Sequence, residues 1–216
     1  MEECAVTPKE KYDKAAAETV INALRKRNMD GSFAATGEDA VRQALAFLKP
    51  GMTVSSGGSM TLGEIGMMKA AADAGCTVLE RRKDFAPSES REFFAKVSAC
   101  DCYFMSTNAI TMDGQLYNVD GSGNRVSSLI FGPEKVVIIA GMNKVVLDTG
   151  EAEARMRRIA APLNAVRLGC ATPCTLTGKC SDCQSPDCIC CNTVITRRGR
   201  VAGRIHVILV GQELGY

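Results

Sequence analysis

The stretch KVVIIAGMNK, residues 135–144, decides the fold class of this chain. Its first part, Lys135–Ala140, is rich in β-branched apolar residues, which is typical of a strand buried on both faces of a parallel sheet. Its second part, Gly141–Lys144, lies just past the carboxyl end of that strand, where open α/β sheets place their ligands. The stretch predicts a central parallel strand and the sheet edge that holds a site.

Shorter apolar runs on both sides of this stretch alternate with helical patterns. The predicted strands are Ser32–Thr36, Met52–Ser55, Thr77–Glu80, Cys102–Met105, Thr193–Thr196 and Ile205–Val210. The predicted helices are Pro8–Asn28, Glu38–Leu48, Thr61–Ala74, one capped by Ser88, Val126–Phe131, and Gly150–Ala160 ending near Pro162. This alternation predicts an α/β fold with a mainly parallel sheet flanked by helices, a C-terminal Cys-rich loop and two final strands, in one domain over residues 1–216.

Three predicted loops with small polar residues each follow a strand directly. They are Ser56–Ser59, Ser106–Ala109 and Gly141–Lys144. Because the carboxyl ends of parallel strands share one edge of a sheet, we expect these loops to lie together. In the first loop, Gly57, Gly58 and Ser59 lead into a helix, so free amides and a hydroxyl favour an anion there. A plain helix cap is the alternative interpretation.

The second loop opens a longer polar stretch, STNAITMDGQLYNVDGSGNR, residues 106–125. Asp113-Gly114 within it predicts a type I′ hairpin turn, because glycine accepts a positive φ at no steric cost. The candidate ligand-binding residues of this stretch are Thr107, Asn108, Asp113, Gly121, Asn124 and Arg125. An ordinary glycine-rich turn whose polar groups satisfy one another is the alternative.

Charged residues in two of these loops suggest how an anion is held. Arg125 and Lys144 are the candidate partners of a carboxylate or phosphate, and Asn143 lies next to Lys144. Asp120 is the candidate general base. The alternative for Asp120 is a lasting salt bridge with Arg125 that keeps the carboxylate ionised.

Composition and charge narrow the class of protein. With 46% hydrophobic and 23% charged residues the chain is globular, and a net charge of +2 gives no general attraction to nucleic acid. No apolar run approaches the roughly 20 residues that span a bilayer. Met1–Cys4 does not begin a basic region followed by an apolar run, as a signal peptide would. We therefore expect a cytoplasmic protein with no nucleic-acid partner and no membrane span.

Seven of the eleven cysteines lie in one short segment, residues 170–191. Thiolates at short spacing among Gly and Pro suit either an iron–sulfur cluster, which we favour, or tetrahedral zinc. Two CxxC pairs are present, Cys180 with Cys183 and Cys188 with Cys191, and a second possible set is Cys174, Cys180, Cys183 and Cys190. The alternative is a group of reduced, partly buried thiols.

Two further features favour structural over functional roles. The basic run Arg81–Lys83 is typical of a solvated face. The lone histidine, His206, lies inside a predicted strand, so we expect it to be structural. A single histidine also excludes a Cys₂His₂ zinc finger.

Three stretches together resemble one protein family. They are SSGGSMTLGEIG (residues 55–66), STNAITMDGQLYNVDGSGNRV with FGPEKVVIIAGMNKVV (residues 106–146), and PCTLTGKCSDCQSPDCIC (residues 173–190). The chain resembles the LUD-domain, or lactate-utilisation, proteins over nearly its full length. That resemblance implies a fold similar to the sugar-phosphate isomerase, glucosamine-phosphate deaminase and CoA-transferase group. It also implies Cys174, Cys180, Cys183 and Cys190 as cluster ligands, although Cys188 stands where a basic residue is expected.

The resemblance also implies a function. Bacterial members of that family are implicated in oxidising L-lactate to pyruvate, in systems whose other subunits carry iron–sulfur clusters. We therefore expect a protein that binds a small anionic ligand and takes part in electron transfer with iron–sulfur partner subunits. A stand-alone sugar-phosphate or acyl-CoA enzyme with a structural zinc clip is one alternative. A non-catalytic binding or regulatory module is another.

Overall fold

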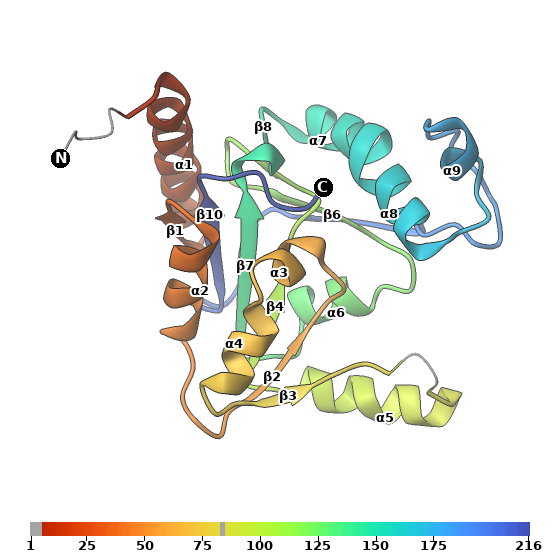
Figure 1. Ribbon diagram of the computed structural model, residues 1–216, viewed down its shortest axis with the longest axis horizontal. Helices are drawn as coiled ribbons and strands as arrows, with labels where there is room; N and C mark the ends of the chain where they lie inside the picture. Colours follow the sequence, from red (N-terminus) through yellow and green to blue (C-terminus); the bar gives the residue numbers. More distant parts are fainter. Residues whose placement is uncertain (1–5, 83–84) are drawn as a thin grey trace.

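Six parallel strands form the main sheet of the computed structural model, which describes residues 6–82 and 85–216. Their order is β1-β10-β7-β4-β2-β3 (Figure 1). The bounds are β1 Asp30–Ala34, β2 Thr53–Ser56, β3 Thr77–Leu79, β4 Cys102–Met105, β7 Lys135–Gly141 and β10 Ile205–Val210. The predicted central strand is β7, which lies between β10 and β4. Met1–Cys4 and Lys83 lie outside the described residues.

Helices cover both faces of this sheet, so the α/β fold class is confirmed (Figure 1). One face packs against α1 (Pro8–Lys26), α5 (Pro87–Ser98) and α6 (Asn124–Ile130). The other packs against α2 (Gly37–Leu45), α3 (Met60–Glu64) and α4 (Met67–Asp73). Strand β7 serves both cores, because successive side chains of a strand point to opposite faces: Val136 and Ile138 belong to the first core, Val137 and Ile139 to the second.

A second, smaller sheet was not predicted. It has the order β8-β5-β6-β9. The bounds are β5 Ala109–Thr111, β6 Leu116–Asp120, β8 Val145–Val146 and β9 Asn192–Thr196, with a 3₁₀ turn, η1, at Met142–Lys144. Its core packs against α7 (Thr149–Arg155) and the helical segments that follow. The two predicted final strands, β9 and β10, therefore lie in different sheets.

Two predicted helices differ from the structure by more than a few residues at their ends or by a break. The helix expected over Thr61–Ala74 is divided into α3 and α4, because Gly66 adopts a left-handed φ of 64° between them. The helix expected to end near Pro162 continues through a π-helical turn, η2 (Met156–Ala160), into α8 (Ala161–Leu168). A wider turn accommodates proline there, since proline lacks an N–H and its ring clashes with the carbonyl four residues earlier.

Two local predictions were wrong. The Asp113-Gly114 turn is not of type I′, since only Gly114 has a positive φ, of 84°; the N–H of Gly114 donates to Thr111 in a loop that Gln115 closes. Helix α5 begins at Pro87 after Ala86, and not at Ser88, because proline fits the first helical position. Glu89 then accepts the N–H of Ala86 at 2.8 Å.

His206 has the surroundings of a structural residue. Its Nε2 lies 3.0 Å from the Ser32 hydroxyl, and its ring packs against Phe47 at a centroid distance of 4.8 Å. Burial, together with the nearby Lys135 charge, lowers the pKa of His206 to about 4, so the ring is neutral at physiological pH. No helix within residues 6–82 and 85–216 is long and apolar enough to cross a bilayer.

Candidate functional site

A cavity of about 320 Å³ lies at the carboxyl ends of the central strands, where the three polar loops meet. Loops from β2, β4 and β7 all contribute to it, as the parallel sheet predicts. The candidate residues that line the cavity are Gly58, Ser59, Thr107, Asn108, Asp120, Gly121, Asn124, Arg125 and Lys144. The expected convergence of the three loops is therefore present.

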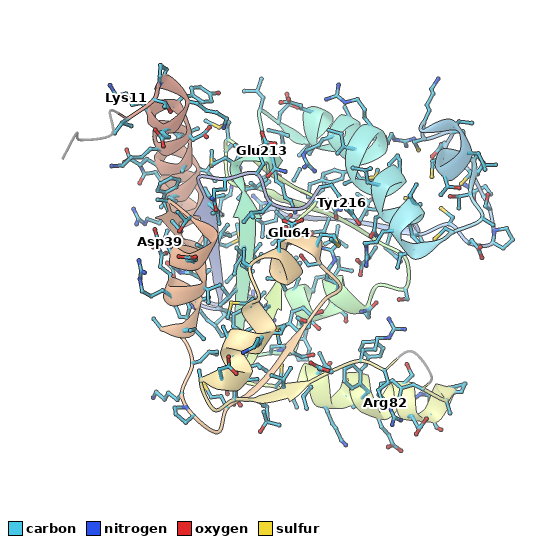
Figure 2. The ribbon with its side chains drawn as sticks, viewed as in Figure 1. Lys11, Asp39, Glu64, Arg82, Glu213 and Tyr216 are labelled. Carbon is cyan, nitrogen blue, oxygen red and sulfur yellow. The ribbon has the colours of Figure 1, made fainter. Side chains whose placement is uncertain are left out.

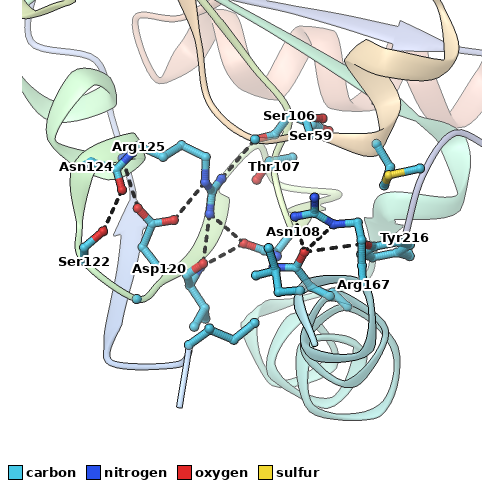
Figure 3. A pocket seen from close by; sticks show the side chains of 18 of the residues that line it. Ser59, Ser106, Thr107, Asn108, Asp120, Ser122, Asn124, Arg125, Arg167 and Tyr216 are labelled. Atoms are coloured by element: carbon cyan, nitrogen blue, oxygen red, sulfur yellow. Dashed lines mark hydrogen bonds and ion pairs between the residues drawn. The ribbon is translucent and has the colours of Figure 1, made fainter. Parts of the chain in front are cut away.

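Arg125 is the hub of this site (Figure 3). Each of its five N–H groups donates to an acceptor of the protein itself. The acceptors, at 2.6–3.0 Å, are Asp120 Oδ1, Asn118 Oδ1, Asn108 Oδ1 and the carbonyl oxygens of Ser106 and Val119. Because no N–H group of Arg125 is left for a ligand, Arg125 fixes the positions of the loops and does not bind an anion directly.

Asp120 holds the beginning of α6. Its Oδ2 accepts the backbone N–H groups of Arg125 at 3.0 Å and of Val126 at 3.3 Å, while Oδ1 accepts Arg125 Nε at 2.9 Å. Both members of the ion pair are nearly buried, with 12% and 11% of the Arg125 and Asp120 side chains exposed. These contacts match the salt-bridge alternative for Asp120, and its role as a general base stays a prediction.

Most polar atoms in the loop after β4 are hydrogen-bonded within the protein, and few remain to bind a ligand in the cavity. The Thr107 hydroxyl donates to the Ala109 carbonyl at 2.8 Å, which fixes the turn. Asn108 Oδ1 accepts the Val119 N–H at 2.9 Å and Arg125 Nη2 at 3.0 Å. The amide nitrogen of Asn108 makes no hydrogen bond within the described part of the chain, which leaves it available to a ligand.

Three predicted ligand residues lie outside the cavity lining. Gly57 packs against Arg125, where an added Cβ would come within 2.9 Å of Arg125 Cδ. Asp113 makes a 2.5 Å ion pair with Arg27, at the hairpin loop between β5 and β6. Asn143 fixes the end of the chain, since its Oδ1 accepts the Leu214 N–H at 3.2 Å.

Several residues of the cavity were missed by sequence reasoning. Those with long polar or charged side chains include Arg81, Asn164, Arg167 and Tyr216. Arg81 belongs to the basic run interpreted as a solvated face, and its guanidinium lies 5.4 Å from the Phe94 ring centroid. Arg167 donates to Asn164 Oδ1 at 3.0 and 2.6 Å from an α8 that sequence reasoning ended too early (Figure 3). No local signal in the sequence links these residues to the loops.

The cavity carries an excess of positive charge. Its acidic, guanidinium and amine side chains are Arg81, Asp120, Arg125, Lys144 and Arg167. Asp120 is neutralised by Arg125, so the guanidinium groups of Arg81 and Arg167 and the amine of Lys144 remain without an ion pair within residues 6–82 and 85–216. Arg81 and Arg167 are exposed, whereas Lys144 is buried. A cavity with this excess of positive charge favours the binding of a small anion whose charged group lies near the rim.

A second cavity, of about 210 Å³, is lined by five of the clustered cysteines. They are Cys174, Cys180, Cys183, Cys188 and Cys190. The segment that carries them follows α8, includes the short helix α9 (Pro173–Thr177) and joins β9. Its end is fixed beside the first cavity, because the Cys191 N–H donates to the Asp120 carbonyl at 3.1 Å. Val119 and Ile189 line both cavities.

The chain matches the model of the LUD domain over residues 17–210. This chain belongs to the LUD-domain family. No functionally curated protein matched it. Among solved structures, it is similar to a DUF162 family protein from Deinococcus radiodurans, with a TM-score of 0.52 and 10% identity over 92% of this chain and 98% of that one. A weaker similarity is to eIF2B beta from Chaetomium thermophilum, with a TM-score of 0.37 and 13% identity over 53% and 44% of the two chains. The Deinococcus similarity agrees with the fold described above.

The cysteine thiolates of this LUD-domain protein are soft donors of the kind that bind zinc or an iron–sulfur cluster. Cys174, Cys180, Cys183 and Cys190, the predicted set, all face one small cavity, and so does Cys188. In the described ranges, no three His, Cys, Asp or Glu side chains converge closely enough to hold an ion as they stand. Binding would therefore require the thiol segment to tighten around the group. Arg157 restrains the thiol segment near Cys180, since its Nη1 donates to the neighbouring Asp182 at 3.2 Å.

Proposed function

We propose that this protein binds a small carboxylate of the lactate and pyruvate class in the cavity at the carboxyl ends of the strands. The observation that carries the proposal is the excess of positive charge from the exposed Arg81 and Arg167, which line the same cavity as the buried amine of Lys144. Membership of the LUD-domain family supports a place in lactate utilisation. The free amide nitrogen of Asn108 adds a donor for a hydroxyl or carbonyl oxygen of the ligand.

Anion binding makes a prediction for Arg167. Changing Arg167→Gln removes a cation from the rim without removing any hydrogen bond from the Arg125 hub. We expect the dissociation constants of both L-lactate and pyruvate to rise about tenfold, which corresponds to roughly 1.4 kcal/mol. Isothermal titration calorimetry at low ionic strength measures this, because salt screens exposed charges.

The matched control is Arg42→Gln, an exposed arginine on α2 outside the cavity. We expect this variant to bind both acids as the unchanged protein does. Glycerol, which has no charge, should not bind to either. If phosphate esters bind while lactate and pyruvate do not, a sugar-phosphate site replaces the proposal. If no small anion binds, the non-catalytic module is the better interpretation.

We further propose that the cysteine segment holds an iron–sulfur cluster through Cys174, Cys180, Cys183 and Cys190. When bound, such a cluster supplies one-electron transfer. The nearness of the two cavities supports a link between ligand oxidation and electron transfer to partner subunits, since Val119 and Ile189 line both. Val119 and Ile189 would then separate the ligand in the first cavity from the thiolates in the second.

Anaerobic purification tests the cluster. We expect a brown protein with iron and acid-labile sulfide, and complete loss of both in the variant with all four cysteines changed to serine. Cys191→Ser is the matched control, because Cys191 lies in the same segment but outside the cavity lining. A colourless protein with stoichiometric zinc would support a structural zinc clip. A protein with no metal would contradict both the iron–sulfur cluster and the zinc clip. Retained iron in Cys190→Ser but not in Cys188→Ser would reassign the ligand.

A further inference from the structure

Lys144 is the buried amine of the ligand cavity. It lines the cavity and yet is only 3% exposed. Its Nζ donates to Thr61 Oγ1 at 2.9 Å and to Ser106 Oγ at 3.0 Å. No carboxylate forms an ion pair with it within the described part of the chain. Lysine is rarely buried without such a partner, so this arrangement calls for a chemical explanation.

The hydrogen bonds of Lys144 fit a neutral amine. An ammonium group has three N–H donors, whereas a neutral amine has two and a lone pair. The two hydroxyl acceptors, on Thr61 and Ser106, match the two donors of the neutral form. Thr61 is itself fixed in this role, because its hydroxyl donates to the Leu214 carbonyl at 3.1 Å. The lone pair of the neutral amine is then free to act as a nucleophile.

The charges around Lys144 act in the same direction. Burial is the largest cause, and the positive charges of Arg155 on α7 and Arg125 on α6 add to it; together they lower the pKa of Lys144 to about 7. Glu64 on α3 (Figure 2) opposes them, and its carboxylate accepts the Gly215 N–H at 2.8 Å. A lysine desolvated in this way is nucleophilic near neutral pH.

We propose that Lys144 forms an imine with the carbonyl carbon of a 2-oxo acid bound in this cavity. The proposal rests on the carboxylate ligand proposed above and assigns its reactive class. Arg81 and Arg167 are exposed and line the same cavity as Lys144, so the proposal assigns the carboxylate to their guanidinium groups and the neighbouring carbonyl carbon to Nζ. A 2-hydroxy acid has no such carbon, so the amine distinguishes the two ligands by chemistry and not by charge.

The step balances without an oxidant. The Nζ lone pair forms a bond to the carbonyl carbon, and the carbonyl π pair moves to oxygen, which takes up a proton. The carbinolamine then loses one water as its C–O bond breaks, and the nitrogen gives up its protons to leave a C=N bond. One amine and one carbonyl give one imine and one water. Water must leave the cavity, which is open to solvent at its exposed rim.

Reductive trapping tests the proposal. The full chain is incubated with pyruvate and sodium cyanoborohydride, digested and analysed by mass spectrometry. We expect one reduced pyruvyl group, located on Lys144, and none after incubation with L-lactate. When attack by the amine limits the rate, trapping should speed up as pH rises through about 7, because only the neutral amine attacks and its fraction grows as pH passes the pKa of Lys144.

Two variants and one binding measurement make the outcome decisive. An arginine side chain cannot form the imine, so trapping should vanish in Lys144→Arg. The control Lys11→Met changes an exposed lysine on α1 and should be trapped as the unchanged protein is (Figure 2). Calorimetry with pyruvate is run in parallel. Pyruvate that binds without trapping, or traps equally on surface lysines, would overturn the imine and leave the carboxylate site intact. Absence of any binding would overturn both proposals.

Discussion

Changing Arg125→Ala is expected to lower the free energy of unfolding by about 3–5 kcal/mol, as the loss of one member of a buried ion pair does. The substitution leaves Asp120 without its cation in a site where only 11% of that side chain is exposed. It also leaves unpaired the side-chain oxygen of Asn118, which accepts Arg125 Nη1 at 2.6 Å, and removes one of the two donors to Asn108 Oδ1, at 3.0 Å. Urea denaturation followed by circular dichroism measures the change.

The comparison variants separate geometry from charge. Arg125→Lys keeps the positive charge but has a single ammonium in place of a planar fork, so we expect it to recover only a minority of the lost stability. Arg167→Ala removes a cation from the same cavity. Because the hydrogen bonds of Arg167 go only to the nearby Asn164, we expect the free energy of unfolding to fall by less than about 1 kcal/mol. An Arg125→Ala variant as stable as Arg167→Ala would show that the loops do not depend on this guanidinium.

A methyl group at Gly141 is expected to destabilise the protein by about 3 kcal/mol and to abolish ligand binding. The Cβ of Gly141→Ala would lie 2.5 Å from the Gln212 carbonyl oxygen and 2.6 Å from the Leu214 nitrogen. Both are backbone atoms, so the overlap is relieved only if the end of β7 or the segment after β10 moves. Lys144 follows directly in the η1 turn and would move with it.

Gly63→Ala is the matched control for that substitution. Nothing lies within 4 Å of a Cβ at Gly63, which is exposed on the short helix α3. We expect this variant to be neutral or more stable by about 0.5–1 kcal/mol, since alanine restricts the unfolded chain. Thermal unfolding of the two variants, with pyruvate calorimetry on each, measures both effects. Full ligand binding by Gly141→Ala would contradict the close packing behind the site.

The sequence is informative where a local pattern has a single physical meaning. A β-branched run such as Lys135–Ala140 fits only a buried strand, and β7 lies at the centre of the sheet. Loops that follow parallel strands must share an edge, so the meeting of Gly58, Thr107 and Lys144 at one cavity followed from strand direction alone. The LUD-domain resemblance pointed to the same stretches.

The remaining features depend on contacts between distant residues. Arg125 offers five donors to any partner, and the sequence does not reveal that the protein's own loops accept all of them. Arg167 was missed because a π-helical turn carries the helix past Pro162, against the usual effect of proline. Asp113 looked like a site residue, but its partner Arg27 lies in a helix cap far away in sequence.

The position of β10 has a consequence for how the chain folds. This strand pairs with β1 on one side and β7 on the other, so it joins two parts of the sheet that are made much earlier. Until Ile205–Val210 leaves the ribosome, both β1 and β7 present an open edge with unpaired backbone groups. Long-range parallel pairing of this kind is slow. The nascent chain is therefore expected to rely on chaperones to protect those edges until β10 has been made.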